Sequence, residues 1–456
     1  MGGLNATLYI GMQALDATQG ALDATSNNIA NANTPGYTRE VPQFTEGSLN
    51  FENDQVVGGG VSLSSLQSVR DEVLNAQIQQ QTSAQSSVDT QSSSLQQIQA
   101  YFSSTGADIG SELSSFSGSL AQLSANPSNS SVQQSVVSSG QSLAQSFNTT
   151  ANGLASAQSA ADSQVTQTVA QINSLTQQIA QLNGEVNQLT TAGKDGGTVE
   201  DQRDELVQQL SQLTGIQVTQ GSSGEVITTG NGTALVDGTQ SFSLQTSTGA
   251  NGFQQVLDSQ GNNITSSLQG GTLGGAIQVR DQIIPGYLNQ LNTLASQFAT
   301  AFNAAQATGF TSSGAAGGSF FTISNAASAA ATISVSNTAQ IAGSSDGSAG
   351  SNGNVANLQA TLTNALPSGQ SVEQGYSNLV FQVGNDTSNA STESSAIGQN
   401  LLQLTNQQSS VSGVSINEET ANLIRYQTAY EAAARIVSTV QALSTVTLDM
   451  GSSQSY

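Results

Sequence analysis

The sequence predicts a mainly α-helical protein with a small β domain inserted among its helices. Three observations support this fold class. Apolar residues recur at helical spacing at both ends of the chain, long helical stripes lie between them, and short alternating runs interrupt the helices at residues 215–269. We therefore expect N- and C-terminal helices paired as a coiled coil, a long helical-bundle middle layer and an outer β-rich domain.

The first predicted helix carries a seven-residue repeat. Large apolar side chains recur at Leu8, Leu15, Leu22 and Ile29, with small residues at the half-step positions between them. Such a narrow seam is typical of a helix that pairs with one other helix. The helix is expected to end near Asn33.

Residues 34–37 are expected to form a type II turn, because Pro35 suits its second position and Gly36 tolerates the positive φ of its third. The following residues, 41–63, read as extended and polar chain. We interpret them as a connector from an inner helical layer to an outer domain.

Long helical patterns then fill most of the chain. They cover residues 74–102, 109–123, 165–189, 277–302 and 376–404, with a shorter helix around 206–213. The stripe at 165–189 is the most regular, and at ~1.5 Å per residue it would be about 36 Å long. Residues 314–367 are rich in Gly, Ser, Ala and Asn, with a strand expected at 333–335 and a helix around 358–366.

The last helix, expected over residues 415–450, carries a matching stripe. Its apolar and aromatic members are Ile416, Leu423, Tyr426, Tyr430, Ala433, Val437, Val440 and Leu443. Ser415 and Glu418 have the spacing of a capping box, and the helix N-terminus alone would explain Glu418 and Glu419. Antiparallel pairing with the first helix would bring the two ends of the chain together.

These elements suggest four units. Residues 1–40 with 412–456 form a terminal coiled-coil assembly domain, and residues 41–214 with 270–310 and 368–411 form a long-helix domain. Residues 215–269 form the small β domain. Residues 311–367 form a Gly- and Ser-rich loop or a reduced outer domain.

Composition argues against several classes of function. The net charge of -23 comes from 30 acidic residues against 7 Lys and Arg, and those few cations are scattered, so we expect no nucleic-acid partner. Cysteine and histidine are both absent, which excludes thiolate and imidazole metal sites and His-dependent catalytic triads. We expect no catalytic residue, no cofactor and no metal.

One acidic cluster could suggest acid–base chemistry. Asp201, Asp204 and Glu205 share a short predicted helix, and paired carboxylates can act as acid and base when burial separates their pKa values. Because Arg203 sits among them and the surroundings are polar, we interpret the cluster as a solvated helix face.

No stretch of the chain predicts contact with a membrane. No run approaches 18 apolar residues, and the first residues lack the basic and apolar regions of a secretory signal. A secreted destination would therefore require an export route that does not cleave a signal.

Two terminal motifs resemble a known family. The stretch 24–37, which includes Asn28, Asn31, Pro35, Gly36 and Tyr37, resembles the N-terminal signature of the axial proteins of the bacterial flagellum, and residues 414–430 resemble their C-terminal signature. Within that family, segments 201–206 and 274–281 are similar to the FlgK hook-associated proteins and are not expected in rod proteins. The resemblance covers most of the chain and fades at about 314–367.

The resemblance implies a structural adaptor at the hook–filament junction that polymerises through its terminal helices. The implied partners are copies of the chain, hook protein, a second junction protein and an export chaperone, with secretion through the flagellar type III apparatus. We predict an assembly interface formed by Leu8, Leu15, Leu22, Ile29, Leu423, Tyr426, Tyr430, Val437 and Val440, and a signature turn formed by Asn28, Asn31, Pro35, Gly36 and Tyr37.

Three alternatives remain at this point. The chain could be another axial protein, of hook or rod, or a secreted coiled-coil adhesin, which shares the composition but would need a secretory signal. A hydrolase acting through carboxylates alone is the third, and its candidates would be Asp201 and Asp204.

Overall fold

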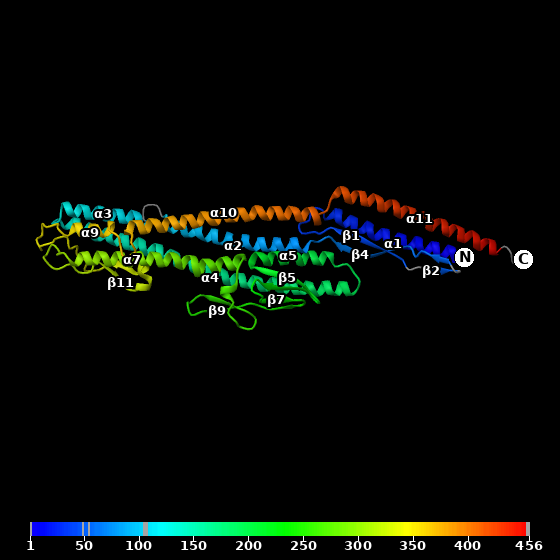
Figure 1. The fold of residues 1–456 in the computed structure, drawn as a ribbon, viewed down its shortest axis with the longest axis horizontal. Helices are drawn as coiled ribbons and strands as arrows, with labels where there is room; N and C mark the ends of the chain where they lie inside the picture. Colours follow the sequence, from blue (N-terminus) through cyan, green and yellow to red (C-terminus); the bar gives the residue numbers. More distant parts are fainter. Residues whose placement is uncertain (1, 48–49, 53–54, 104–107, 453–456) are drawn as a thin grey trace.

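The protein is an elongated rod of long helices that run along a common axis (Figure 1). The computed structural model describes residues 2–47, 50–52, 55–103 and 108–452; residues 1 and 453–456 of the predicted terminal domain lie outside this description. At one tip of the rod, α1 (Gly2–Ala30) and α11 (Ile416–Ser452) lie side by side. The predicted fold class, mainly helical with a small β-rich region and paired terminal helices, is confirmed.

Long helices with shorter connecting ones build the body of the rod. Their bounds are α2 (Glu72–Phe102), α3 (Ile109–Ala125), α4 (Ser130–Thr191), α5 (Gly197–Leu213), α6 (Gly271–Gln278), α7 (Ile284–Ala307), α8 (Ala329–Thr332), α9 (Val355–Thr363) and α10 (Val372–Ser412). A π-helical turn, Val279–Ile283, joins α6 to α7, and 3-10 turns lie at Thr265–Ser267 and Ala326–Ser328.

Side-chain caps start four of the long helices, α2, α3, α4 and α10. The Asp71 carboxylate accepts a hydrogen bond from the Leu74 amide at 3.0 Å, and Asp108 does the same for Ser111. Asn129 caps α4, and Ser371 forms a full capping box at the start of α10. Because these caps satisfy backbone donors that the helix leaves unpaired, they fix where each helix begins.

The longest helix, α4, has 62 residues, and the sequence predicted only its second half. Its first half also buries one face, through Val136, Leu143, Phe147 and Leu154. Ser, Ala and Gly dilute that face in the sequence. A Cβ atom at Gly140 would lie only 2.7 Å from the Phe320 ring, so the small residue makes room for an aromatic neighbour.

The core of the end farthest from α1 is a cluster of phenylalanine rings. Phe116 contributes from α3, Phe298 and Phe302 from α7, and Phe320 and Phe321 from the segment that follows α7. Their ring centroids lie 4.9 to 6.5 Å apart, in tilted and edge-on arrangements that aromatic rings favour. This cluster holds three separate parts of the chain together.

The segment 311–367 therefore packs into the body of the rod. It contains β11 (Phe321–Ile323), the predicted strand β12 (Ile333–Val335) and α9, close to the predicted helix. Ile333, Val355 and Leu358 are buried in the same core as the phenylalanines. Gly and Ser dominate its composition because its loops are long, and its few apolar residues point inward.

The predicted β-rich region forms two small antiparallel sheets beside α4. Strands β5 (Ile216–Gly221), β6 (Gly224–Thr229), β7 (Ala234–Asp237) and β8 (Gln240–Ser241) pair in that order, and β9 (Gln245–Thr248) pairs with β10 (Gln254–Leu257). Ile227, Leu235 and Val256 are buried against α4 residues such as Ile172 and Ile179. The regular apolar stripe of α4 is thus the surface on which the two sheets pack.

The segment predicted as a connector is extended, but it forms two antiparallel hairpins. β1 (Glu40–Glu46) pairs with β4 (Val61–Ser68), and β2 (Asn50–Glu52) pairs with β3 (Gln55–Val57). β1 and β4 pack against α1. At Gly20 of α1 a Cβ atom would lie 2.5 Å from Leu63, which shows how closely helix and hairpin approach.

We expect Phe116→Ala to destabilise the protein by about 3–5 kcal/mol, because Phe116 is fully buried among four other rings. Urea unfolding followed by circular dichroism measures the loss. Phe381→Ala is the matched control, since Phe381 is 74% exposed and its removal should change stability by less than about 0.5 kcal/mol. Equal effects of the two substitutions would contradict the assigned core.

Candidate assembly interface

Two contacts fix how the terminal helices pair. A Cβ atom at Gly11 of α1 would lie 2.8 Å from a Val437 methyl of α11, and the Asn28 amide donates to the Glu419 carboxylate at 3.2 Å. Residue numbers therefore rise along α1 as they fall along α11, and the helices are antiparallel. The contact joins residues that are nearly the whole chain apart.

The predicted seam of α1 lies beside this contact, half-buried. Leu8, Leu15, Leu22 and Ile29 are all partly exposed, and the buried positions of α1 are mainly small residues, Gly11, Ala17, Ala21, Ala24 and Thr25, together with Asn28. The reason is that α1 has two neighbours, α11 and the β1–β4 hairpin. The face between the two neighbours is the most crowded, and only small side chains fit there.

The predicted residues of α11 mostly face α1. Val440 is buried, Leu423, Tyr426 and Val437 are half-buried, and Tyr430 is 37% exposed. Tyr426 also meets Phe44 of β1, with ring centroids 6.2 Å apart.

Two residues placed in the same predicted stripe do not join this contact. Ile416 and Leu443 are 52% and 50% exposed. They lie on other faces of α11, because the stripe drawn from sequence was wider than the contact that a single helix can cover.

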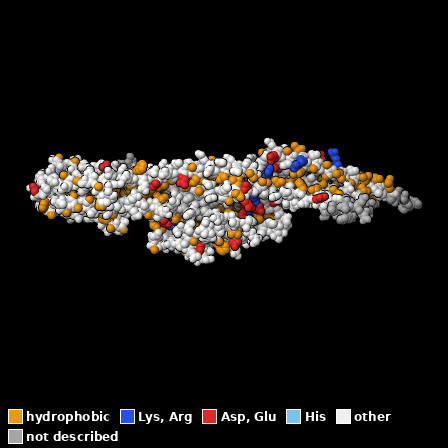
Figure 2. All heavy atoms as spheres, viewed as in Figure 1, with side chains coloured by type: hydrophobic (Ala, Val, Ile, Leu, Met, Phe, Trp, Pro, Cys, Tyr) orange, Lys and Arg blue, Asp and Glu red, His pale blue; other side chains and the backbone are white. Residues whose placement is uncertain are grey.

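A second apolar row therefore remains exposed on α11. Ile436, Leu443 and Val446 follow one another at helical spacing, and each is about half-exposed. On α1, Tyr9 and Met12 are likewise 53% and 56% exposed. Figure 2 shows apolar side chains gathered over this end of the rod. Contiguous exposed apolar rows are typical of surfaces that bind another protein.

The type II turn predicted at residues 34–37, which belongs to the proposed signature turn, is present. Gly36 has a φ of 79°, and the Tyr37 amide donates to the Thr34 carbonyl at 3.3 Å, as in a type II turn with Pro35 at its second position. Asn31 accepts a hydrogen bond from the Thr34 hydroxyl at 3.2 Å and ties the turn to the end of α1.

Asn28 is the hydrogen-bonding centre of the terminal unit. Its side-chain oxygen accepts from the Tyr37 hydroxyl at 2.8 Å and from the Glu40 amide at 3.0 Å. Its side-chain nitrogen donates to the Glu40 carbonyl at 2.8 Å and to Glu419 at 3.2 Å. All four bonds available to a buried amide are thus made, joining α1, the turn, β1 and α11.

The prediction that the helix N-terminus alone explains Glu418 and Glu419 was wrong. Glu419 is buried and binds Asn28, while Glu418 forms an ion pair with Arg39 at 3.0 Å. Glu419 therefore connects α11 to α1, and Glu418 connects it to the segment that follows α1. Sequence spacing could not show this, since the partners lie almost 400 residues away.

Two chain segments, 68–71 and 412–415, join the terminal unit to the body of the rod, and hydrogen bonds tie both of them to Arg39, which follows the turn. The Arg39 amide donates to the Ser412 carbonyl at 3.0 Å, and the Val69 amide donates to the Arg39 carbonyl at 2.9 Å. The Thr38 amide donates to the Asp201 carboxylate at 2.9 Å.

The acidic cluster predicted to be a solvated face lies largely inside this junction. Arg70 forms ion pairs with Glu200, with Asp201 at 2.6 Å and with Asp204 at 3.4 Å. The Asp201 and Asp204 side chains are only 12% and 31% exposed, so the prediction was wrong for both, whereas Glu205 is exposed. The pairing of Arg70 with this cluster could not be predicted from the sequence, because Arg70 is 131 residues from Asp201.

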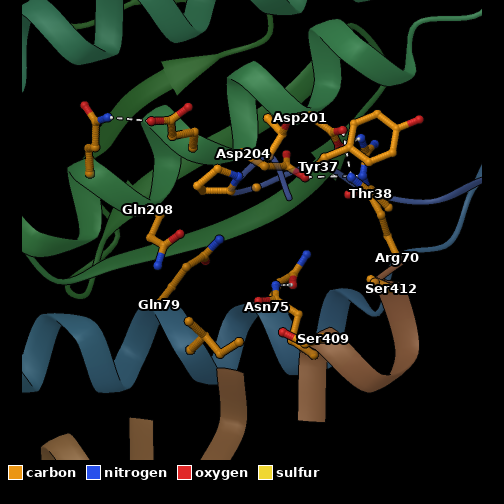
Figure 3. Close-up of a pocket in the computed structure, with 18 of the residues that line it drawn as sticks. Tyr37, Thr38, Arg70, Asn75, Gln79, Asp201, Asp204, Gln208, Ser409 and Ser412 are labelled. Atoms are coloured by element: carbon orange, nitrogen blue, oxygen red, sulfur yellow. Dashed lines mark hydrogen bonds and ion pairs between the residues drawn. The ribbon is translucent and has the colours of Figure 1, made fainter. Parts of the chain in front are cut away.

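A cavity of about 1150 Å³ opens beside the turn. Figure 3 shows its walls: Tyr37, Thr38, Arg70, Asp201 and Asp204 on one side, with Asn75 and Gln79 of α2, Gln208 of α5, and Ser409 and Ser412 of α10 around the rest. Side-chain amides and hydroxyls dominate the lining, and two of its carboxylates, Asp201 and Asp204, form ion pairs with Arg70. Among the described residues, no acidic group is arranged to hold a metal ion.

Two titrating groups of the junction are strongly perturbed. Burial raises the pKa of Glu40 to about 7, and the carboxylates of Asp195 and Asp201 add to the effect. Burial and the same acidic surroundings also raise the pKa of the Tyr37 hydroxyl, so it stays protonated and donates to Asn28.

Three family profiles match the chain. Residues 95–321 match the flagellar hook-associated protein FlgK helical domain, residues 8–38 the flagella basal body rod protein, and residues 406–450 the C-terminal part of the flagellar basal body rod FlgEFG proteins. The two rod-protein matches fall on the paired terminal helices and the signature turn.

Curated proteins match over nearly their full length. Flagellar hook-associated protein 1 of Bacillus subtilis is 31% identical, covering 93% of this chain and 94% of the relative. The protein of the same name from Escherichia coli is 26% identical, covering 95% and 97%. The solved structure of the hook junction protein FlgK from Burkholderia pseudomallei aligns with a TM-score of 0.51 and 31% identity, covering 54% of this chain and 46% of that one.

We expect Glu40→Gln to remove a pH dependence from the junction. The Glu40 carboxyl keeps its proton up to about pH 7 in the folded protein but only up to about pH 4.5 in the unfolded chain. The contribution of protonated Glu40 to the stability of the junction is therefore fully present below pH 4.5 and is lost as the pH rises through 7. The neutral amide should make the junction more stable than wild type by about 1–2 kcal/mol at pH 8, and similar to it at pH 5.

Hydrogen exchange of peptides covering the Thr38 and Glu40 amides, corrected for intrinsic rates, measures this difference. Glu46→Gln, on the exposed end of β1, is the control and should leave the exchange rates of these amides unchanged at both pH values. A difference at pH 8 no larger than that at pH 5 would refute the assigned ionisation.

Proposed function

Because the chain belongs to the flagellar hook-associated protein 1 (FlgK) family, we propose that its paired terminal helices join it to neighbouring subunits at the hook–filament junction. Members of this family are structural components of the bacterial flagellum, and this chain shares their sequence over almost its whole length.

One observation carries the proposal. The α1–α11 pair satisfies its inner face within the molecule and still exposes apolar rows on both helices at one tip of the rod. A single copy leaves these rows unburied, and copies stacked by a head-to-tail contact would cover them. The β-rich region and the phenylalanine core lie farther along the rod and would face outward (Figure 1).

The predicted interface residues then have two roles. Leu423, Val437 and Val440 hold α11 against α1, and the half-buried seam of α1 borders the surface open to a neighbour. Tyr430, with its ring partly exposed, lies at the edge between the two. The signature turn, centred on Asn28, sets the angle between the terminal pair and the rod.

By its place in the family, the chain would contact copies of itself, hook protein on one side and the second junction protein on the other. An export chaperone would hold it before assembly. None of the described helices is long and apolar enough to span a bilayer. The rows exposed on α1 and α11 would be the surfaces that these partners share.

A structural role also fits the state of the acidic residues. Asp201 and Asp204, the candidates for carboxylate catalysis, are engaged by Arg70 and by the Thr38 amide. Such pairing holds carboxylates in fixed bonds and leaves neither poised as a free acid or base. The hook or rod alternative is weaker, because the FlgK helical-domain profile covers residues 95–321.

We expect Gly11→Leu to impair assembly of the junction. Any side chain at Gly11 must displace Val437 and push α11 away from α1. In the host lacking its own copy of the gene, hooks that carry filaments should fall at least tenfold, as counted by electron microscopy.

Gly3→Leu is the matched control. Gly3 is on the same helix, yet nothing lies within 4 Å of a Cβ placed there, so filament numbers should stay at the wild-type level. Circular dichroism of both secreted proteins checks that the body of the rod is folded. Normal filaments with Gly11→Leu would show that the α1–α11 pairing is dispensable for assembly.

A further inference from the structure

The exposed charged residues of α1 are all acidic, whereas α11 exposes two arginines near its middle in addition to acidic residues. In α1 the only charged side chains are Asp16 and Asp23, and both are exposed. They belong to a row of exposed residues at heptad spacing: Tyr9, Met12, Asp16, Gln19, Asp23 and Ser26. We call these residues the acidic row of α1.

On α11 the exposed charges at mid-helix are mainly arginines. Arg425 and Arg435 are exposed, and neither forms an ion pair within 4 Å with any described residue. The other four arginines of the chain all form ion pairs within the molecule. The Arg425 guanidinium is held over the Tyr426 ring, 5.0 Å from its centroid. Glu431 is exposed between the two arginines, so this stretch has a net charge of one positive unit.

Arg425, Ala432, Arg435, Ile436, Thr439 and Leu443 form what we call the basic row of α11. The two contacts that fix the helix pairing, Gly11 with Val437 and Asn28 with Glu419, also fix the relative height of the rows. Each residue adds ~1.5 Å along a helix, so positions along the pair can be counted from these two contacts. By this count Asp23 lies level with Arg425 along the axis of the helix pair, and Met12 lies level with Ile436.

Resting on the proposed function, we propose that the acidic row of one copy docks on the basic row of α11 in the next copy. Asp16 and Asp23 would pair with Arg435 and Arg425, while Tyr9 and Met12 would cover Ile436 and Leu443. The contact is heterologous, so the same joint can repeat from copy to copy.

Charge selects this arrangement over the two symmetric ones. Contact between two α1 helices would bring aspartates together, and contact between two α11 helices would bring arginines together, and both are repulsive. The chain has 30 acidic residues and only 7 basic ones. Two arginines of α11 without an ion pair are therefore among the few groups that could attract the acidic row of another copy. The apolar residues of each row supply contact area, and the charges supply orientation.

Charge reversal in separate copies tests the proposal. Arg425→Glu with Arg435→Glu, and Asp16→Arg with Asp23→Arg, should each lower the number of filament-bearing hooks at least tenfold. Co-expression of the two reversed chains in one cell should restore filaments to within about threefold of wild type, because each reversed row then meets its complement on a neighbour. The rescue would also show that both chains fold.

Glu185→Arg with Glu393→Arg is the matched control. It makes the same change of charge as Asp16→Arg with Asp23→Arg, at two exposed residues of α4 and α10, and should leave filaments unaffected. Full assembly by either reversed chain alone would overturn the proposal. So would rescue only when all four reversals are placed in one chain, which would show that the pairs form within a copy.

A deletion of residues 2–30 separates this proposal from the proposed function. If the deletion abolishes filaments while the reversed chains assemble normally, the terminal helices are needed and the charge pairing is refuted. Filaments that persist after the deletion would refute the assembly role itself.

Discussion

The structure depends on one antiparallel contact between helices at opposite ends of the chain. Asn28 and Glu419, 391 residues apart, mark where it begins, and Gly11 beside Val437 marks how closely the helices approach. Closing so long a loop costs more entropy than a short one, although the cost grows only slowly with length. The narrow face of α1 offsets part of it through close packing of alanines and through the fully bonded amide of Asn28.

In the junction beside this contact, a few basic side chains neutralise several partly buried carboxylates. Arg70 engages three carboxylates from α5, and one of these, Asp201, also accepts from the backbone beyond the turn. Burying an arginine in this way is favourable only when its partners satisfy its charge. Glu40, left without a cation of its own in the same surroundings, responds instead by holding its proton. A single cluster thus connects the segment that follows α1, the residues that precede α2, and α5.

Much of the fold could be predicted from periodicity, because long amphipathic helices have apolar residues at regular helical spacing in the sequence. The terminal helices, the turn at Gly36 and the β-rich region were all recognisable. The first half of α4 was not, since serine and alanine dilute its buried face and tertiary contacts, such as Gly140 with Phe320, decide its packing. The roles of Arg70 and Glu419 were missed for a different reason: each acts through a partner far away in the sequence, and local spacing carries no signal of such a pair.

The two backbone crossings near residues 68–70 and 412–415, which residues 38–40 tie together, have a mechanical consequence. If the tip formed by α1 and α11 is fixed in a rotating shaft, every twisting load on the outer rod must pass through these crossings and the Arg70 cluster that surrounds them. The long helices on either side resist bending, as their backbone bonds run along the axis. Torsional compliance would therefore concentrate at a few hydrogen bonds around Thr38 and Arg39, where small changes in side-chain pairing could set how stiffly the molecule transmits torque.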